Sequence, residues 1–301
     1  MSVVPSYLSK GDTIAIVATA KKINPSEVEF AISTLKNWGF KVKLGEHLYN
    51  EHHQFAGTDE QRLNDFQNAL DDPSIDAILC ARGGYGTVRI IDNIEFSSFI
   101  KTPKWIIGFS DITVLHNHIH QNFGVATLHA TMPINFSSNT ETSLNSLHDA
   151  LTGSLEKYHL SPSAYNRLGN GKGELVGGNL SIIYSLLGSR SDIDTTGKIL
   201  LIEDLTEYLY HVDRIMIALK RTGKLKNLAG LMVGSFTKMQ DNDIPFGKKL
   251  EEIIIDAVKI YDYPICFNVP IGHEDENWSL PLGTRVELKV HQINTELSFI
   301  N

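Results

Sequence analysis

Residues 104–113 read Lys104-Trp-Ile-Ile-Gly-Phe-Ser110-Asp-Ile-Thr113, and this stretch indicates both a fold class and a reactive position. The apolar run with β-branched residues before Ser110 is typical of a strand that is buried on both faces. The stretch from Asp111 to Gln121 has helical spacing without Gly or Pro, which predicts a helix. Ser110 then stands on a strand-to-helix turn, where the N–H of Asp111 points toward any oxyanion formed there. Serine is also a favoured helix N-cap, so the turn alone leaves both roles open.

The first half of the chain alternates apolar strands with helical stretches. The expected strands are 13–18, 41–44, 77–81 and 105–109, and the expected helices are 25–38, 59–70 and 111–121. Such alternation predicts an α/β fold with a parallel sheet that is covered by helices. In open sheets of this kind ligands bind beyond the carboxyl ends of the strands. Gly83-Gly84 and Ser110 both follow such ends, so we expect them to share one crevice.

A polar, glycine-rich stretch interrupts this pattern between residues 160 and 173, and it indicates a domain boundary. Beyond it we expect helices at 178–187, 212–222 and 246–260 and strands at 199–202, 230–233, 265–269 and 285–290. The sequence therefore predicts an N-terminal domain over residues 1–160, a linker over 161–173 and a C-terminal α/β domain over 174–301.

Composition excludes several classes of protein. The formal net charge of −8 over 301 residues argues against general binding to nucleic acid or to an anionic membrane surface. The two cysteines, Cys80 and Cys266, end probable strands, and we expect them to be reduced and structural. The first residues lack a basic region followed by an apolar core, and no segment approaches about 20 apolar residues. We therefore expect a cytoplasmic protein.

The segment Arg82-Gly-Gly-Tyr-Gly86 follows a predicted strand, and its glycines allow the backbone to approach a ligand with N–H groups pointing inward. Such a loop can hold an oxyanion, a carboxylate or a phosphate. It does not match the dinucleotide fingerprint, and it lacks the lysine of a P-loop. The structural alternative is an ordinary tight turn.

Two further segments carry groups suited to acid–base chemistry. Glu203 closes a buried strand, where a carboxylate can orient a histidine, although it could instead be exposed or pair with Arg214. His273 lies in a long polar loop, and an imidazole with its ordinary pKa near 6.5 suits proton transfer near neutral pH.

Other histidines compete for the role of the base. His116 and His120 share one face of the helix after Ser110, but no third zinc ligand is in view, so we interpret them as solvated or core residues. No metal is expected. Spacing alone does not exclude His129 or His211 as the base.

Several motifs in this order and spacing resemble the serine LD-carboxypeptidase family, the muramoyltetrapeptide carboxypeptidases, with which the microcin-immunity peptidases belong. The resemblance covers most of the chain. The motifs are Phe55-Ala-Gly-Thr-Asp-Glu-Gln-Arg62, Cys80-Ala-Arg-Gly-Gly-Tyr-Gly-Thr87, Ile107-Gly-Phe-Ser-Asp-Ile-Thr113, Gly173-Glu-Leu-Val-Gly-Gly-Asn-Leu180, Ile202-Glu-Asp204, Pro270-Ile-Gly-His273 and Leu280-Pro-Leu-Gly283.

The resemblance implies a catalytic triad with Ser110 as nucleophile, His273 as general base and then acid, and Glu203 as the group that orients His273. It also implies an oxyanion hole from the backbone N–H groups of Asp111 and Gly84. The implied architecture is a Rossmann-like N-terminal domain with a parallel sheet and a second α/β domain, with the active site between them. The resemblance implies a homodimer, and it implies no cofactor.

The implied reaction is hydrolysis of the amide between an L-centre of a murein tetrapeptide and its terminal D-Ala, a step of peptidoglycan recycling in the cytoplasm. Arg82, beside Gly83, is our hypothesis for the cation that binds the D-Ala carboxylate. A related serine peptidase acting on peptidyl-nucleotides is the alternative, with Trp278 stacking on a base. A non-catalytic protein that binds a small anion is a third possibility.

Overall fold

The computed structural model describes residues 2–300, which form two compact α/β units. Unit 1 comprises residues 2–155 and 275–283, and unit 2 comprises residues 156–274 and 284–300. The prediction of an α/β protein with two such parts is confirmed. The division differs from the expected boundaries, because the chain leaves unit 1 at Leu155 and returns to it for residues 275–283.

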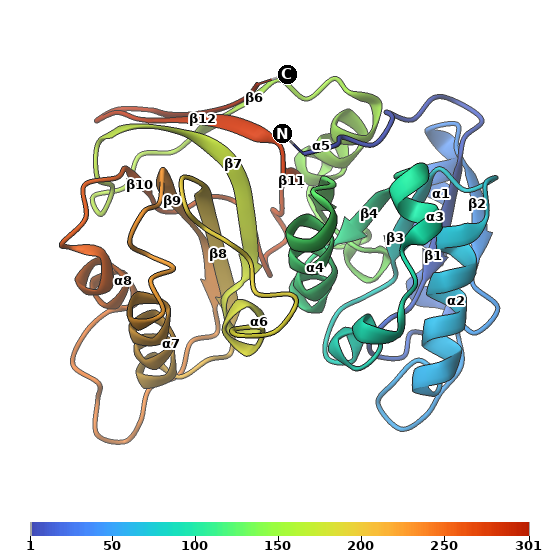
Figure 1. Ribbon diagram of the computed structural model, residues 1–301, viewed down its shortest axis with the longest axis horizontal. Coiled ribbons are helices and arrows are strands. Elements are labelled where there is room, and N and C mark those ends of the chain that lie inside the picture. The colour runs from blue at the N-terminus through green and yellow to red at the C-terminus, as the bar shows by residue number, and fades with distance from the viewer. Residues whose placement is uncertain (1, 301) are drawn as a thin grey trace. The chain divides into compact units, whose positions relative to one another are not determined.

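Unit 1 is built on a six-stranded sheet (Figure 1) with the strand order β11-β5-β4-β3-β1-β2. The first five strands along the chain are parallel, and β11 pairs with β5 in the antiparallel direction. The bounds are β1 Thr13–Val17, β2 Lys41–Leu44, β3 Ala77–Cys80, β4 Trp105–Gly108, β5 Thr127–His129 and β11 Leu280–Leu282. The expected strands over residues 13–18, 41–44, 77–81 and 105–109 are thus present with small changes at their ends.

Five α-helices accompany this sheet within the described residues of unit 1. They are α1 Glu29–Asn37, α2 Asp59–Asp71, α3 Ser97–Lys101, α4 Thr113–Phe123 and α5 Glu141–Thr152. Helix α2 begins at a capping box, because Thr58 Oγ1 accepts from Gln61 N and Gln61 Oε1 accepts from Thr58 N. Because the capping box sets the residue at which α2 begins, it also sets which residues of the helix face the sheet.

The strand order reverses at β1, whose neighbours are β2 on one side and β3 on the other. In doubly wound sheets this reversal opens a crevice at the carboxyl ends of the two central strands. The loops that follow β1 and β3, residues 18–22 and 81–86, lie there. The glycine loop therefore begins where such folds bind ligands.

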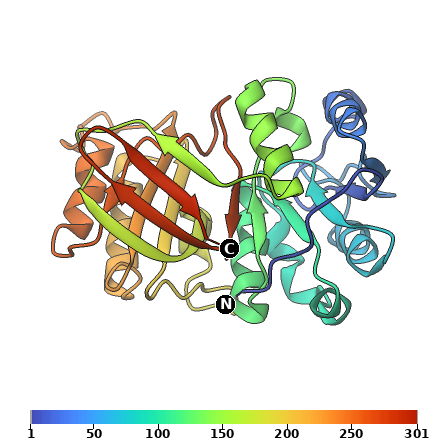
Figure 2. The same ribbon diagram turned by 90° about the horizontal axis from the view of Figure 1, so that it is seen from above.

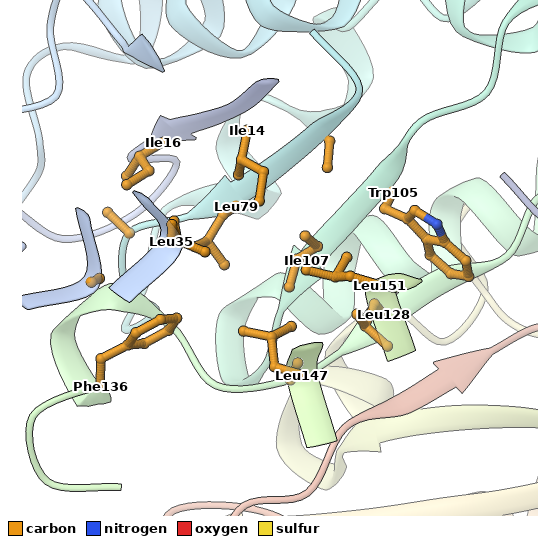
Figure 3. Packing of buried hydrophobic residues seen from close by; sticks show 14 of the residues in the cluster. Ile14, Ile16, Leu35, Leu79, Trp105, Ile107, Leu128, Phe136, Leu147 and Leu151 are labelled. Atoms are coloured by element: carbon orange, nitrogen blue, oxygen red, sulfur yellow. The ribbon is translucent and has the colours of Figure 1, made fainter. Parts of the chain in front are cut away.

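One hydrophobic core of unit 1 lies between the sheet and helices α1 and α5. Figure 3 shows side chains of four parallel strands meeting Leu35 of α1 and Leu147 and Leu151 of α5. All of these side chains are fully buried. Burial of each leucine side chain stabilises the folded state by about 1.5–3 kcal/mol.

Unit 2 contains a seven-stranded mixed sheet with the order β10-β9-β8-β7-β12-β13-β6. Strands β10, β9, β8 and β7 are parallel, while β12, β13 and β6 continue the sheet in antiparallel pairs (Figure 2). The strand bounds are β6 Lys157–Leu160, β7 Gly169–Asn179, β8 Ile199–Leu205, β9 Gly230–Thr237, β10 Ile265–Cys266, β12 Arg285–Val290 and β13 Thr295–Phe299. The helices are α6 Leu180–Ser185, α7 Leu209–Arg221 and α8 Leu250–Val258.

Residues 169–173 form the start of β7, whereas the sequence predicted a linker over 161–173. The glycines there serve close packing. A Cβ at Gly171 would overlap the carbonyl oxygen of Ala229, so a larger residue would force the backbones apart. Composition alone does not distinguish such a glycine from one in a flexible loop.

Two other elements differ from expectation. The strand expected over 265–269 is only the short β10, and β11 lies within the polar loop expected after His273. Among residues 2–300, none of the helices has the length and apolar character needed to span a bilayer.

Candidate active site

Ser110 occupies a strained turn at the carboxyl end of β4. Its φ angle is +62°, a left-handed conformation that costs a non-glycine residue about 1–2 kcal/mol. It is the first residue of a short 3₁₀ helix, η4 Ser110–Ile112, and Phe109 takes the N-cap position. Ser110 is therefore not the N-cap, and the turn has the strain that is typical of a nucleophile elbow.

A buried histidine holds the backbone just before this turn. His116 of α4 places Nε2 2.8 Å from the carbonyl oxygen of Gly108 and Nδ1 2.8 Å from Thr127 Oγ1. Burial lowers the pKa of His116 to about 4, so its ring is neutral, with Nε2 donating to the carbonyl. His116 is a core residue that supports the turn. No group of three or more metal-ligating side chains within residues 2–300 is arranged to hold a metal.

The glycine loop approaches Ser110 closely. A Cβ added to Gly83 would lie 3.0 Å from Ser110 Cβ, 3.1 Å from Ser110 Oγ and 3.3 Å from Asp111 N. A side chain at residue 83 would therefore press on the serine hydroxyl. The glycine loop and Ser110, which we expect from the sequence to share one crevice, therefore lie next to each other within unit 1.

Asp111, the residue after Ser110, contacts the residue that follows the glycine loop. Its side chain is 1% exposed, and Oδ2 accepts a 2.8 Å hydrogen bond from Thr87 N. Burial raises the pKa of Asp111, and the bonds from Thr87 and the charge of Arg62 oppose that rise. The carboxylate of Asp111 thus faces the end of the glycine loop.

Arg82 is already engaged within unit 1. Its Nη1 donates a 3.0 Å hydrogen bond to the carbonyl oxygen of Lys22, in the loop after β1. This bond uses one of the five guanidinium N–H groups, so the others determine whether Arg82 can bind a carboxylate.

The fully buried Glu203 and the partly exposed His273 form a pair within unit 2. Glu203 lies near the end of β8 with its side chain 0% exposed, and Oε2 is 2.8 Å from His273 Nδ1. Because a carboxylate only accepts, Nδ1 is the donor, and this fixes the tautomer with Nε2 as the basic nitrogen. Glu203 is therefore neither exposed nor paired with Arg214, whose guanidinium lies 5.2 Å from the centre of the Tyr210 ring.

A glycine beside His273 permits this pairing. Gly272 has a φ of +127°, and a Cβ there would lie 2.9 Å from Glu203 Oε2 and would overlap Ser235 Oγ. A side chain at residue 272 would separate the carboxylate from the imidazole.

The environment raises the pKa of His273 above its ordinary value of 6.5. Burial alone lowers it, but the charge and hydrogen bond of Glu203, helped by the charge of Asp204, outweigh the burial. Since the folded-state pKa exceeds the unfolded one, the pair stabilises the fold fully below about pH 6.5. This contribution is lost as the pH rises through the folded-state pKa.

We expect Glu203→Gln to lower the pKa of His273, because the neutral amide removes the charge that favours the imidazolium. NMR titration of the ring nitrogens should give a wild-type pKa above 6.5 and a lower value in the variant. Equal pKa values in the two proteins would contradict this assignment of the cause.

Asp204, the next residue, is a second buried carboxylate. Its Oδ2 accepts from Ser181 N at 2.9 Å, and its Oδ1 accepts from Asn179 Nδ2 at 3.0 Å and from Leu205 N at 2.9 Å. Burial, with the charge of Glu203, raises its pKa to about 7. Asp204 therefore joins the ends of β7 and β8 with the start of α6. The motif Ile202-Glu-Asp204 contains this residue, but no role for it could be predicted from the sequence.

The other candidate residues have separate surroundings. His129 is fully buried in β5 beside Phe109, with ring centroids 5.8 Å apart. His211, in the first turn of α7, bonds to Glu207, which precedes the helix. Trp278 lies in residues 275–283 of unit 1, and its Nε1 donates to Glu276 Oε1 at 3.0 Å. Only His273 is paired with Glu203.

The predicted site residues thus fall into two groups. Unit 1 carries Ser110, Asp111, Arg82, Gly83 and Gly84, and unit 2 carries Glu203 and His273. Gly83 lies against Ser110 and Asp111 in unit 1, and His273 bonds to Glu203 in unit 2. Arg82 bonds to Lys22, and a Cβ added to Gly84 would meet the side chain of Lys21.

Comparison with known proteins gives two family models that match successive parts of the chain. One, described as the LD-carboxypeptidase N-terminal domain, matches residues 14–130, and the other, the LD-carboxypeptidase C-terminal domain, matches residues 172–288. A relative in Bacillus subtilis named probable murein peptide carboxypeptidase is 37% identical, over 94% of this chain and 91% of its own. A murein tetrapeptide carboxypeptidase of Pseudomonas aeruginosa is 28% identical, over 93% of this chain and 94% of its own.

Solved structures give the same picture of the fold. The crystal structure of a muramoyltetrapeptide carboxypeptidase from Oxalobacter formigenes has a TM-score of 0.88 at 26% identity, covering 96% of this chain and 99% of that one. The structure of MccF in complex with glutamyl sulfamoyl guanosine has a TM-score of 0.87 at 20% identity, covering 98% of each chain. At that identity the second likeness concerns the fold alone.

Proposed function

Because this chain belongs to the LD-carboxypeptidase family and is a serine-type carboxypeptidase, we propose that it releases the terminal D-Ala of murein tetrapeptides with the triad Ser110, His273 and Glu203. The observation that carries the proposal is the 2.8 Å hydrogen bond from His273 Nδ1 to the buried Glu203. This bond gives the imidazole the tautomer that a general base requires.

The relatives support the substrate class. Two proteins that align with more than nine-tenths of this chain are named for murein peptides, and one of these names specifies a tetrapeptide. Their similarity extends over both units, so it includes the segments of all three triad residues. The amide between an L-centre and D-Ala is accordingly the bond that we expect the enzyme to cleave.

The first half of the reaction forms an acyl-enzyme. Ser110 Oγ attacks the carbonyl carbon of the amide while His273 Nε2 takes the hydroxyl proton. The carbonyl oxygen becomes an oxyanion and accepts hydrogen bonds from the N–H groups of Asp111 and Gly84. His273 then gives its proton to the amine of D-Ala as the carbon–nitrogen bond breaks.

The second half restores the enzyme. Water attacks the ester carbonyl while His273 takes its proton, and the proton returns to Ser110 Oγ as the ester bond breaks. Glu203 stays ionised and stabilises the imidazolium in both halves. Since neutral His273 is the base, kcat/KM should rise with pH through an apparent pKa above 6.5.

The substrate can be tested directly. The purified protein is incubated with a cell-wall tetrapeptide ending in D-Ala and, in parallel, with the same peptide ending in L-Ala, and release of alanine is followed by mass spectrometry. We expect release from the first peptide only. Release from neither would contradict the proposed substrate.

An aminoacyl sulfamoyl adenosine serves as the third substrate in that assay. If the protein hydrolyses this compound and not the tetrapeptide, the result would favour the alternative hypothesis of a peptidyl-nucleotide substrate. The similarity of the fold to that of MccF is compatible with this hypothesis. Failure to process any substrate, together with an unreactive Ser110, would favour the anion-binding alternative. The homodimer, the cytoplasmic location and the role in peptidoglycan recycling stay expectations from the resemblance.

We expect Arg82→Ala to raise KM for the tetrapeptide with a smaller change in kcat, because the lost group binds the D-Ala carboxylate in both the ground and transition states. A hydrogen bond to a charged group is worth about 1.5–3 kcal/mol, or roughly a ten- to hundredfold rise in KM. Steady-state kinetics measure this. An unchanged KM would leave Arg82 with only its bond to Lys22.

A further inference from the structure

A buried arginine in unit 1 has no role in the mechanism described above. Arg62 lies in the first turns of α2 and its side chain is only 1% exposed. Burial of a guanidinium carries a large desolvation cost unless its N–H groups are used in hydrogen bonds. The acceptors of Arg62 therefore indicate what the residue does.

Two of these acceptors are backbone carbonyls in the two loops at the strand-order reversal. Nη1 donates to Thr19 O at 2.6 Å, in the loop after β1, and to Gly86 O at 3.0 Å, at the end of the glycine loop after β3. Nη2 bonds to Asp59 on the same helix. Arg62 thus connects both loops to α2, the helix drawn in light blue in Figure 1.

The glycine loop accommodates this guanidinium closely. A Cβ added to Gly86 would lie 2.7 Å from Arg62 Nη1 and 3.2 Å from Thr19 O. The next residue is held from two sides, because Thr87 N donates to Asp111 Oδ2 at 2.8 Å and Thr87 Oγ1 is 2.8 Å from Thr19 Oγ1. The end of the loop is therefore fixed by α2 and by the segment that carries Ser110.

This arrangement determines how far the glycine loop lies from Ser110. Gly83 is three residues before Gly86, and a Cβ added to it would lie 3.1 Å from Ser110 Oγ and 3.3 Å from Asp111 N. A shift of Gly86 would be transmitted through this short loop to Gly84, whose N–H the proposed function assigns to the oxyanion hole. Displacement of an oxyanion-hole donor by even 1 Å lowers its catalytic effect strongly.

We propose that Arg62 is a positioning residue for the oxyanion hole, holding the glycine loop at its working distance from Ser110 through Gly86 O and Thr19 O. The inference rests on the proposed function, since it assigns part of the oxyanion hole to that loop. Arg62 itself touches neither the nucleophile nor the substrate.

The test compares Arg62→Met, Arg62→Lys and the control Arg89→Met. The side chain of Arg89 also bonds to Asp59, at 2.6–3.0 Å, but to neither loop carbonyl; its backbone N–H donates to Gly86 O at 3.0 Å, and Arg89→Met leaves that bond in place. Loss of one oxyanion-hole donor costs about 100-fold or more in kcat, and we expect a loss of about 100-fold in Arg62→Met with KM changed less than threefold. Arg62→Lys keeps one donor to the carbonyls and should recover part of this rate, while Arg89→Met keeps the wild-type rate.

Inhibitor binding separates positioning from general damage. A tripeptide boronic acid forms a tetrahedral adduct with Ser110, whereas the tripeptide product does not. We expect the inhibition constant of the boronic acid to rise about 100-fold in Arg62→Met, in step with kcat, and that of the tripeptide to change less than threefold. Equal weakening of both inhibitors would overturn the proposal, as would a folded Arg62→Met with kcat within threefold of the wild type.

Failure of the proposed function is distinguished by labelling Ser110 with a fluorophosphonate, a reaction that needs the oxyanion hole but not the natural substrate. If the wild type releases no D-Ala but is labelled, a labelling rate about 100-fold lower in Arg62→Met supports the inference and an unchanged rate overturns it. Absence of labelling in the wild type would overturn both proposals. If circular dichroism shows Arg62→Met to be unfolded, Arg62→Lys decides, and a kcat within twofold of the wild type overturns the inference.

Discussion

Ser110→Ala is expected to lower kcat for D-Ala release by about 10⁶-fold, because no other group can form the acyl-enzyme and only the oxyanion hole and binding contacts remain. KM should change little, since the hydroxyl contributes mainly to the transition state. The substitution also removes little volume, so circular dichroism and thermal melting should match the wild type. Steady-state kinetics with mass-spectrometric detection of D-Ala measure the effect.

Ser138→Ala is the matched control for this variant. Ser138 is an exposed serine of unit 1 whose hydroxyl bonds only locally, to the carbonyl oxygen of Asn135 at 3.1 Å. It should keep the wild-type rate. A Ser110→Ala enzyme with more than a few per cent of wild-type activity would exclude Ser110 as the nucleophile.

The second large effect is expected for His273→Gln, which should also lower kcat by about 10⁶-fold. Glutamine removes the base but keeps an N–H donor for the buried Glu203 Oε2. This choice matters because removal of the whole partner would leave a buried, uncompensated carboxylate, at a cost of about 3–5 kcal/mol in stability. Steady-state kinetics measure the loss of rate, and thermal melting verifies that the variant is folded. His291→Ala, at an exposed histidine of unit 2, controls for loss of an imidazole elsewhere and should be fully active.

The double variant Ser110→Ala/His273→Gln tests whether the two residues act together. Groups that work as one catalytic unit are strongly non-additive, so the double variant should be no slower than either single variant. Since Ser110 belongs to unit 1 and His273 to unit 2, non-additivity would show functional coupling across the two units. Multiplicative losses would mean that the residues act in separate steps, and the triad would then be wrong.

Most of unit 1 could be predicted because its strands and helices are local patterns. Lys41–Leu44 has the expected bounds, as has Arg285–Val290 in unit 2, and the α2 helix ends within one residue of its expected end. The short strands β5 and β11 were not predicted. Each has three residues, too few for an alternation to appear, and each is a strand only because its partner lies beside it.

The site residues differ in how well they could be predicted from the sequence. The position of Ser110 after a buried strand indicated a reactive turn, because that signal is local. The choice of His273 over His129 and His211 could not be made from spacing and came from the resemblance. In the structure His273 is paired with Glu203 while His129 is buried beside Phe109, and these surroundings depend on residues far away in the chain.

What the residue order dictates is the alternation of apolar strands and amphipathic helices, the strand-to-helix turn at Ser110 and the glycine-rich loop before it. These depend on side-chain spacing and backbone freedom over a few neighbouring residues. The folded chain adds contacts between distant segments: the packing of Gly171 against Ala229, the return of residues 275–283 to unit 1, the Glu203–His273 pair, and Arg62 between two loop carbonyls. The physical reason is that packing and the pairing of buried polar groups depend on which residues lie close in space, and residues close in space need not be close along the chain.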